Sequence, residues 1–287
     1  MKKISFSKMS GAGNDFILID KDTNPNLVLS NDVITKLCDR HNGIGADGVI
    51  TIAGSLDSDF VMEYFNADGS TGSLCGNGAR CAISFASEKF SLKNIVRFLS
   101  NGVKYKGEIS DDNKIRFYFN DPEKMKLNFK IKAGGQLINA DYINTGSPHT
   151  VIAINEIVKD PLKPQIHFNE IGDVPVFSLG KEIRYLKDFA PEGTNVNFIN
   201  IRNGKMEIRT YERGVENETL SCGTGAAASA LIGFFKFDLK PPVTLAATGG
   251  DELIVDFKFE DKKIKELSLM GPILNSFTGE FLLNKYL

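Results

Sequence analysis

A short motif that occurs twice limits the folds open to this chain more than any other feature. The stretches "LCGNGARCAIS" (residues 74–84) and "LSCGTGAAAS" (220–229) share the core Cys-Gly-x-Gly-Ala. Alignment of Cys75 with Cys222, an offset of 147 residues, also places Tyr64 on Tyr211. Both copies lead from a strand pattern through a Gly-rich bend into a helical pattern, so we interpret them as one duplicated unit. Two similar domains are predicted.

Length and hydrophobic patterning agree with this prediction. A chain of 287 residues exceeds one ordinary domain and suits two of roughly 100–200 residues each. Strand patterns cover 16–20, 48–54, 114–120, 205–212 and 252–260, and helical patterns cover 31–40, 76–89, 179–189 and 224–236. No low-complexity linker is present, so the first crossing between domains is expected at 120–124. We expect an α/β (α+β) fold with one central helix among strands in each domain.

Charge and composition limit the classes of molecule that this protein is expected to bind. The formal net charge of −2 gives no electrostatic reason to bind nucleic acid or an anionic membrane. The N-terminal stretch lacks the apolar core of a signal peptide, and no apolar run is long enough to span a bilayer. We therefore expect a cytoplasmic protein that acts on a small molecule.

The four cysteines are Cys38, Cys75, Cys81 and Cys222, without a Cys-x-x-Cys pair and with only 3 histidines, so no metal site is predicted. Cys38 and Cys81 fall within helical patterns and are expected in the core.

A cysteine at a helix start has two interpretations. It can pack as a small hydrophobe, or the helix N-terminus can stabilise its thiolate. The matched settings of Cys75 and Cys222 favour a functional role.

Two equivalent acid/base groups on opposing surfaces suit the inversion of a carbon centre. One group removes the α-proton from one face, and the other delivers a proton to the opposite face. The carbanion between these steps needs preorganised donors, which helix N-termini supply. Such a mechanism requires no cofactor.

Seven stretches, taken in order, carry a resemblance to a known family over essentially the whole chain. They are "SGAGNDFILID" (10–20), "GIGADGVI" (43–50), "FNADGSTGSLCGNGARC" (65–81), "GSPHTVI" (146–152), "PEGTNVNF" (191–198), "ERGVENETLSCGTGA" (212–226) and "MGP" (270–272). With them the chain resembles the diaminopimelate epimerase family. These pyridoxal-phosphate-independent enzymes interconvert LL- and meso-diaminopimelate in the lysine pathway, which also supplies peptidoglycan precursor.

The resemblance implies a fold, a site and an assembly. The fold is two pseudo-symmetric domains, 1–121 and 122–275, each a barrel-like sheet around a central helix, with strand 276–287 returning to the first. Cys75 and Cys222 correspond to the catalytic thiols, and a homodimer without cofactor is expected. The substrate-binding residues implied are Asn14, Asn66, Gly76, Asn77, Asn195, Glu212, Arg213, Gly223 and Thr224. His149 and Glu212 correspond to residues that tune the thiols.

Several of these residues also have a simpler interpretation. Asn14 and Asn66 lie in turn sequences, where asparagine often serves the backbone alone. Arg213 beside Glu212 is also compatible with a surface ion pair of little energetic value, and His149 with an ordinary loop residue. The chain also departs from many family members. It has Gly48 in place of Gln and Ser147 in place of Asn, and one extra residue lies between Glu212 and Cys222.

Three other hypotheses remain open at this point. A proline racemase or hydroxyproline epimerase also uses two cysteines, but its substrate lacks a distal amino-acid group. A phenazine-biosynthesis isomerase is similar in fold but lacks the cysteine pair. A redox sensor would join Cys75 and Cys222 in a regulatory disulfide and would not exchange α-protons with solvent.

Overall fold

The computed structural model describes residues 3–72, 74–110 and 114–286. The chain divides into two compact units. Unit 1 comprises Met1–Tyr118 and Met270–Leu287, and unit 2 comprises Phe119–Leu269. Among the described residues, no helix is both long enough and apolar enough to cross a membrane.

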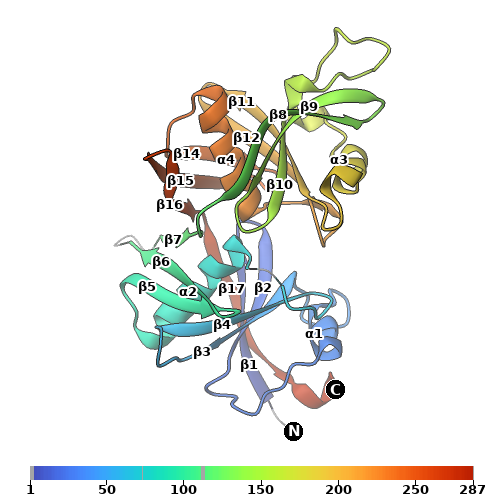
Figure 1. Ribbon diagram of the computed structural model, residues 1–287. Helices are drawn as coiled ribbons and strands as arrows, with labels where there is room; N and C mark the ends of the chain where they lie inside the picture. The colour runs from blue at the N-terminus through green and yellow to red at the C-terminus, as the bar shows by residue number, and fades with distance from the viewer. Residues whose placement is uncertain (1–2, 73, 111–113, 287) are drawn as a thin grey trace. The chain divides into compact units, whose positions relative to one another are not determined.

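Unit 1 consists of strands around one long helix (Figure 1). Its strands are β1 (Lys3–Gly11), β2 (Asn14–Asp20), β3 (Gly48–Ala53), β4 (Phe60–Asn66), β5 (Asn94–Ser100), β6 (Val103–Ile109), β7 (Ile115–Tyr118) and β17 (Ile273–Leu282). Its α-helices are α1 (Asn31–Cys38) and α2 (Gly76–Phe90), and the short helix η4 (Leu283–Lys285) follows β17. The central helix α2 contacts β1, β2, β3, β4 and β7.

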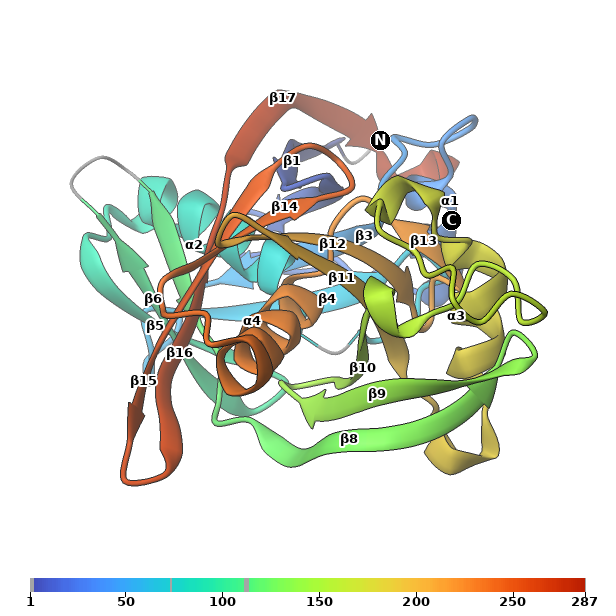
Figure 2. The same ribbon diagram turned by 90° about the horizontal axis from the view of Figure 1, so that it is seen from above.

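Unit 2 repeats this plan around α4 (Figure 2). Its strands are β8 (Glu123–Ala133), β9 (Gln136–Asn144), β10 (Pro148–Ala153), β11 (Asn195–Arg202), β12 (Lys205–Glu212), β13 (Asn217–Thr219), β14 (Val243–Ala247), β15 (Glu252–Glu260) and β16 (Lys263–Met270). Its helices are α3 (Val176–Arg184), α4 (Gly223–Phe237) and the short η1 (Ile154–Glu156), η2 (Ile171–Asp173) and η3 (Lys187–Phe189). Alanines that are fully buried in α4 let the surrounding strands approach closely.

Strand pairing has the same order and the same directions in both units. In unit 1, β17, β1 and β2 pair antiparallel, β2–β3 parallel, β3–β4 antiparallel, β4–β5 parallel and β5–β6 antiparallel. In unit 2, β8, β9 and β10 pair antiparallel, β10–β11 parallel, β11–β12 antiparallel, β12–β14 parallel and β14–β15 antiparallel. Each parallel pair is connected through a helix, as parallel strands require. The predicted fold class, with one central helix among strands in each domain, is confirmed.

The four predicted helices exist, but one was misplaced. The predicted helices at 76–89 and 224–236 match α2 and α4 to within one residue at each end, and α1 ends two residues before residue 40. The helix predicted at 179–189 is α3, which begins at Val176, after Pro175, and ends at Arg184. The helical pattern beyond it belongs to the separate turn η3.

The gap-free alignment of Tyr64 with Tyr211 was wrong by one residue. Tyr211 packs on the α3 side of its sheet, against Gly180 and in one core cluster with Val196. On the corresponding side of unit 1, Phe65 packs against the α1 cluster, whereas Tyr64 contacts Phe16.

Turn length explains the shift. Phe65 forms a bridge with Thr71, and Tyr211 pairs with Glu218, so five residues intervene in unit 1 and six in unit 2. Cys75 and Cys222 each follow four residues after the second member of that pair. The extra residue therefore lies in the turn after Glu212, and Phe65 is the structural counterpart of Tyr211.

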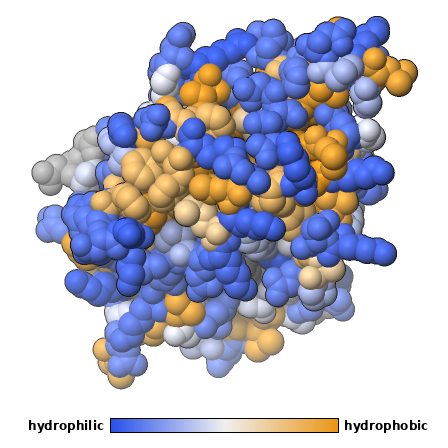
Figure 3. Space-filling model, turned by 45° about the horizontal axis from the view of Figure 1, so that its top comes forward, coloured by the Kyte–Doolittle hydropathy of each residue, from blue (hydrophilic) through white to orange (hydrophobic). Residues whose placement is uncertain are grey.

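Hydrophilic residues cover most of the face shown in Figure 3, with apolar residues in smaller patches among them. The exposed apolar side chains of Met125 and Phe259 line a hollow of about 340 Å³ in unit 2. This apolar hollow contains none of the residues predicted to be functional.

Candidate active site

The predicted site residues gather at one end of each unit, where the central helix begins. In unit 1, β2 starts at Asn14, β3 starts at Gly48, and Gly48 lies opposite Asn66 at the end of β4. In unit 2, β11 starts at Asn195 and β12 ends at Glu212. Because β4 and β12 each run toward the start of the helix that follows, these residues and the cysteines share one end of their unit.

Cys75 and Cys222 occupy the N-cap position of α2 and α4, respectively. Both have extended backbone conformations, and neither side chain caps its helix by a hydrogen bond. Cys75 is partly buried and Cys222 is 8% exposed. The first amides of each helix, from Gly76 and Gly223 onward, lack intrahelical acceptors and favour an anion.

In unit 1, Asn14 and Asn77 form a side-chain pair beside Cys75. The Nδ2 of Asn77 donates to the Oδ1 of Asn14 at 2.7 Å, and Nη1 of buried Arg80 donates to the Oδ1 of Asn77 at 3.0 Å. Asn14 in turn donates to Asp47 at 3.1 Å. Asn14 therefore joins a network that reaches α2, and its role extends beyond the local turn.

A group of hydrogen-bonded charged residues lies next to Asn14. Arg40 binds both Asp15 and Asp47, and Lys8 binds Asp15 at 2.6 Å. Burial raises the pKa of Asp15, but hydrogen bonds and charges from Arg40 and Lys8 outweigh it, and the net pKa lies below its usual value. Asp47, which Arg40 holds in place, fixes the orientation of the Asn14 amide by accepting from its Nδ2.

Asn66 and Gly48 lie around the ring of Tyr64. The Nδ2 of Asn66 donates to the Ser70 hydroxyl at 3.0 Å. A Cβ at Gly48 would approach the Phe65 carbonyl to 2.5 Å and the Tyr64 ring to 2.7 Å, and a Cβ at Gly72 would approach the other ring edge to 2.4 Å. The departure at Gly48 therefore has a steric cause, because Tyr64 fills the space that a side chain there would need.

In unit 2, His149 reaches Cys222 through Thr224. The Nε2 of His149 lies 2.8 Å from the Thr224 hydroxyl, which lies 3.5 Å from Sγ of Cys222. His149 is completely buried, and this burial, together with the positive charge of Arg213, lowers its pKa to about 3. His149 is therefore neutral at physiological pH and belongs to a buried network, unlike an ordinary loop histidine.

Asn195 organises the region around Arg213 and Glu212. Its Nδ2 donates to the Ser147 hydroxyl at 2.9 Å and to the Pro148 carbonyl at 2.8 Å, while its Oδ1 accepts from the Arg213 amide at 2.8 Å. Ser147 thus contacts a predicted site residue despite its departure from the family pattern. The Glu212 carboxylate accepts from Thr219 at 2.8 Å, and the Arg213 guanidinium donates to the Glu192 carbonyl at 3.4 Å.

The remaining two cysteines have the predicted core positions. Cys38 is 5% exposed and Cys81 is completely buried. Burial, with nearby negative charge at Cys38, raises the pKa of each thiol to about 12. Both therefore stay protonated at neutral pH, and their placement in the core is confirmed.

Sequence reasoning missed two buried polar residues beneath α4. Asn197 of β11 and Thr210 of β12 lie opposite each other, and the Thr210 hydroxyl donates to the Oδ1 of Asn197 at 3.0 Å. The signal was present in "NVN" at 195–197, because alternate strand residues share one face. Asn197 therefore lies on the same face of β11 as Asn195.

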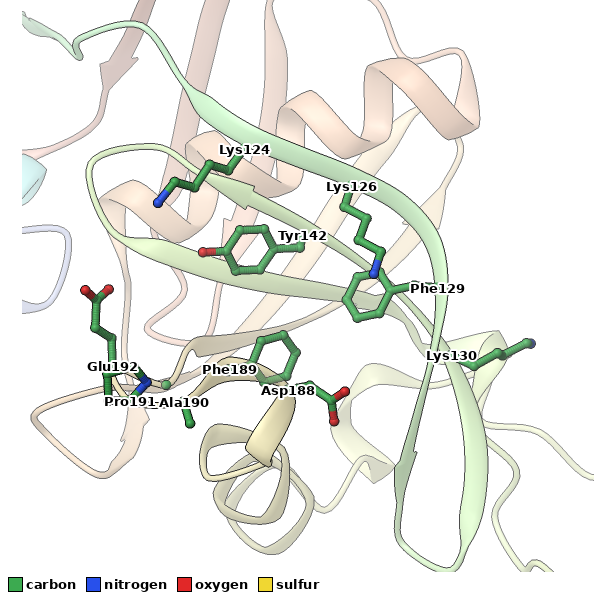
Figure 4. Close-up of a pocket in the computed structure, with 11 residues that line it drawn as sticks. Lys124, Lys126, Phe129, Lys130, Tyr142, Asp188, Phe189, Ala190, Pro191 and Glu192 are labelled. Atoms are coloured by element: carbon green, nitrogen blue, oxygen red, sulfur yellow. The ribbon is translucent and has the colours of Figure 1, made fainter.

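A second hollow of unit 2 borders this set at Glu192, whose carbonyl accepts from Arg213. It measures about 440 Å³, and the rings of Phe129, Tyr142 and Phe189 and the side chains of Lys124 and Lys126 surround it (Figure 4). None of its lining residues belongs to the predicted set. In the part of the chain that the structure describes, no group of three or more His, Cys, Asp or Glu residues is arranged to hold a metal ion.

Comparison with known proteins identifies the family. The family model for diaminopimelate epimerase matches residues 6–125 and 142–273. The chain belongs to the diaminopimelate epimerase family. Named diaminopimelate epimerases from Aquifex aeolicus and Hydrogenobaculum sp. are 37% and 40% identical to it. The first match covers 96% of this chain and 97% of the Aquifex aeolicus protein. The second covers 95% of this chain and 96% of the Hydrogenobaculum protein.

Solved structures with low sequence identity share the fold of this epimerase family member. A phenazine biosynthesis protein from Bacillus anthracis has a TM-score of 0.70 at 14% identity, covering 98% of this chain and 100% of that one. A hydroxyproline epimerase from Agrobacterium vitis has a TM-score of 0.68 at 11% identity, covering 97% and 92%. These likenesses confirm the two-domain fold, while the family assignment rests on the closer sequence relatives.

Proposed function

We propose that this chain is a diaminopimelate epimerase that inverts an α-carbon with two cysteines and no cofactor. The observation that carries the proposal is the placement of Cys75 and Cys222 as N-caps of two topologically equivalent helices. Two relatives named diaminopimelate epimerase match this chain over nearly their whole length. We further propose a homodimer in the cytoplasm that serves lysine biosynthesis and peptidoglycan precursor supply.

The chemistry assigns one thiol to each face of the α-carbon. A thiolate takes the α-proton and becomes a thiol, and the electron pair left on carbon spreads into the adjacent carboxylate. The opposite thiol then gives its proton to the other face of the carbon and becomes a thiolate. The reaction is thus balanced without an oxidant or reductant, and the reverse direction exchanges the two roles.

The helix N-termini stabilise the intermediate in this proposal. Backbone amides of Gly76, Asn77, Gly223 and Thr224 donate to the substrate carboxylate as negative charge develops on it. Glycine at the first helical position of both helices keeps those amides accessible.

The distal amino-acid group of the substrate provides specificity. Arg213 pairs with the carboxylate of this group. Its ammonium donates to the Glu212 carboxylate and to the side-chain oxygens of Asn14, Asn66 and Asn195. Asn14 lies in a turn sequence, as Asn66 does, but its side chain is already held in place by Asp47 and Asn77. A substrate without this distal group would leave Arg213 unused.

Incubation of reduced protein with LL- and meso-diaminopimelate in deuterated water, without pyridoxal phosphate, tests the proposal. We expect deuterium at the α-carbon together with interconversion of the two isomers. Proline and trans-4-hydroxyproline are assayed in parallel. Exchange with those two alone, or no exchange with any substrate, would contradict the proposal.

A further inference from the structure

The amide of Asn197 has one orientation that its neighbours allow. One end of the amide lies 3.2 Å from the Thr150 carbonyl, which can only accept a hydrogen bond. The nitrogen must therefore face Thr150, and the oxygen accepts from Thr210 at 3.0 Å. Asn197 is completely buried, so water does not offer it another arrangement.

This orientation determines which nitrogen of His149 carries the proton. The same Nδ2 of Asn197 lies 3.0 Å from Nδ1 of His149. Two N–H groups cannot face each other across that distance, so Nδ1 is the acceptor and carries no proton. A neutral ring then has its proton on Nε2, which donates to the Thr224 hydroxyl 2.8 Å away.

The hydroxyl proton of Thr224 must then point elsewhere. Since Thr224 accepts from His149, its own hydrogen can be donated to Sγ of Cys222 at 3.5 Å. The backbone of Thr224 is held as well, because its carbonyl accepts from Thr145 at 2.8 Å. The result is a directed chain of donors that runs from strand β11 to the thiol.

We infer that Asn197 is a positioning residue that fixes the tautomer of His149 and thereby directs the Thr224 hydroxyl to stabilise the Cys222 thiolate. This inference rests on the proposed role of Cys222, but it concerns the side chains and can be measured without substrate. The neutral state of the ring agrees with the low pKa that burial gives His149.

The second glycine of Cys-Gly-Thr-Gly fits this arrangement. A Cβ at Gly225 would lie 2.4 Å from the Oδ1 of Asn197 and 3.3 Å from Sγ of Cys222. In unit 1, a Cβ at Gly78 would instead meet Ile50 at 3.2 Å and Phe16 at 3.4 Å. The helix start in unit 2 thus leaves room for the buried amide of Asn197.

The tautomer is tested directly in the wild-type protein by ¹⁵N-histidine labelling and long-range ¹H–¹⁵N correlation. We expect the His149 Nδ1 signal of an unprotonated nitrogen and the Nε2 signal of a protonated one. In Asn197→Asp, an ionised carboxylate can only accept, so we expect Nδ1 to become protonated. A wild-type protein with protonated Nδ1 would overturn the inference, even if the variant does not fold.

The effect on the thiol is read from iodoacetamide labelling of Cys222 at about pH 8.5, near the pKa of a free thiol, followed by mass spectrometry. In Asn197→Asp, Thr224 turns to the neutral ring, and the rate should fall roughly tenfold, equivalent to one hydrogen bond to a charged group. Thr224→Val should give the same loss without moving the tautomer, and Thr224→Ser should restore the rate.

Two controls accompany this measurement. The labelling rate of Cys75 in the same sample is the internal reference and should not change. The variant Asn200→Asp is the matched control, because it places the same substitution on the opposite face of β11. A switched tautomer with an unchanged Cys222 rate overturns the inference and leaves the proposed function intact. Absence of epimerisation in the wild type, with the expected tautomer and rates, would contradict the proposed function alone.

Discussion

The two units use the same strand order and the same cysteine-capped helix, yet they differ in what lies beneath that helix. In unit 1, Ile50 lies opposite Tyr64, and Phe16 packs against Tyr64. The strand positions that correspond in unit 2 hold Asn197 for Ile50, Thr210 for Tyr64 and His149 for Phe16. A backbone plan can thus be duplicated while an apolar layer becomes a hydrogen-bonded one.

This difference shows that the repeated fold fixes the positions of the two cysteines but not the residues around them. Two thiols that take opposite faces of one carbon need equivalent positions, which a repeated fold supplies. They do not need equivalent surroundings. The polar layer of unit 2 leaves few ways to orient its donors, whereas the apolar layer of unit 1 constrains mainly volume.

The largest expected effect tests what the two units share. Cys75→Ala and Cys222→Ala should each lower kcat by about a thousandfold or more, since losing either thiol costs roughly 4–6 kcal/mol of barrier. Epimerisation assays in both directions measure this, with Cys38→Ala as the matched control that keeps activity. Near-wild-type turnover in either active-site variant would exclude the two-thiol mechanism.

The second prediction concerns a charge present in one unit only. Arg213 follows Glu212 at the end of β12, and the corresponding residue after Asn66 in unit 1 is Ala67. Arg213→Met should cost about 2–5 kcal/mol in kcat/KM on diaminopimelate, because the distal carboxylate loses its partner. Simple amino acids should be affected far less.

Arg202→Met, which removes an exposed arginine paired with Glu170, is the matched control for this variant. Equal losses on both substrate classes would place Arg213 at the reacting carbon or in folding. The comparison of the two units would then need a different account of specificity.

The third prediction compares the two second glycines. Gly225→Ala drives a Cβ against the Asn197 amide and should destabilise unit 2 by about 1–3 kcal/mol, the usual cost of overpacking. Gly78→Ala meets the ends of apolar side chains that can shift, and it should cost less. Urea unfolding and kcat of both variants measure the difference, and equal costs would show that the polar layer is no more constrained than the apolar one.

The smallest expected effect is a pH dependence confined to unit 2. His149 has a pKa of about 3 when folded and about 6.5 when unfolded, so its contribution is complete above pH 6.5 and declines as the pH falls. From pH 6.5 to 5.5 the wild type should lose about 1 kcal/mol relative to His149→Phe, which carries the unit 1 residue. Identical pH slopes of unfolding for the two proteins would refute the assignment.

Local signals allowed the helices to be predicted, but not every position in three dimensions. Cysteine followed by glycine fixed the starts of α2 and α4 because the first turn accepts small residues without side-chain constraints. Helix α3 was misplaced since its starting point depends on Pro175, and its Gly180 is required by contact with the Tyr211 side chain. That contact comes from a distant strand and is invisible in a local pattern.

The sequence motifs single out candidate site residues, but they do not show how those residues are connected. The motifs identify Cys75, Cys222 and the asparagines, whereas the role of Asn197 depends on four neighbours from two strands and one helix. One extra residue in the turn after Glu212 also shifted the apparent match of Tyr64 and Tyr211. Composition and spacing do not reveal such a shift, because either residue fits a buried strand position.

Strand β17 has a consequence for the order in which the protein is made. It pairs with β1 along its length, although Lys3 and its partner Leu282 are 279 positions apart in the chain. As the chain leaves the ribosome, unit 2 is complete after residue 269, while β1 still lacks this neighbour. The edge of β1 therefore stays open to mispairing until β17 has been made, and unit 1, which begins before unit 2, is completed after it.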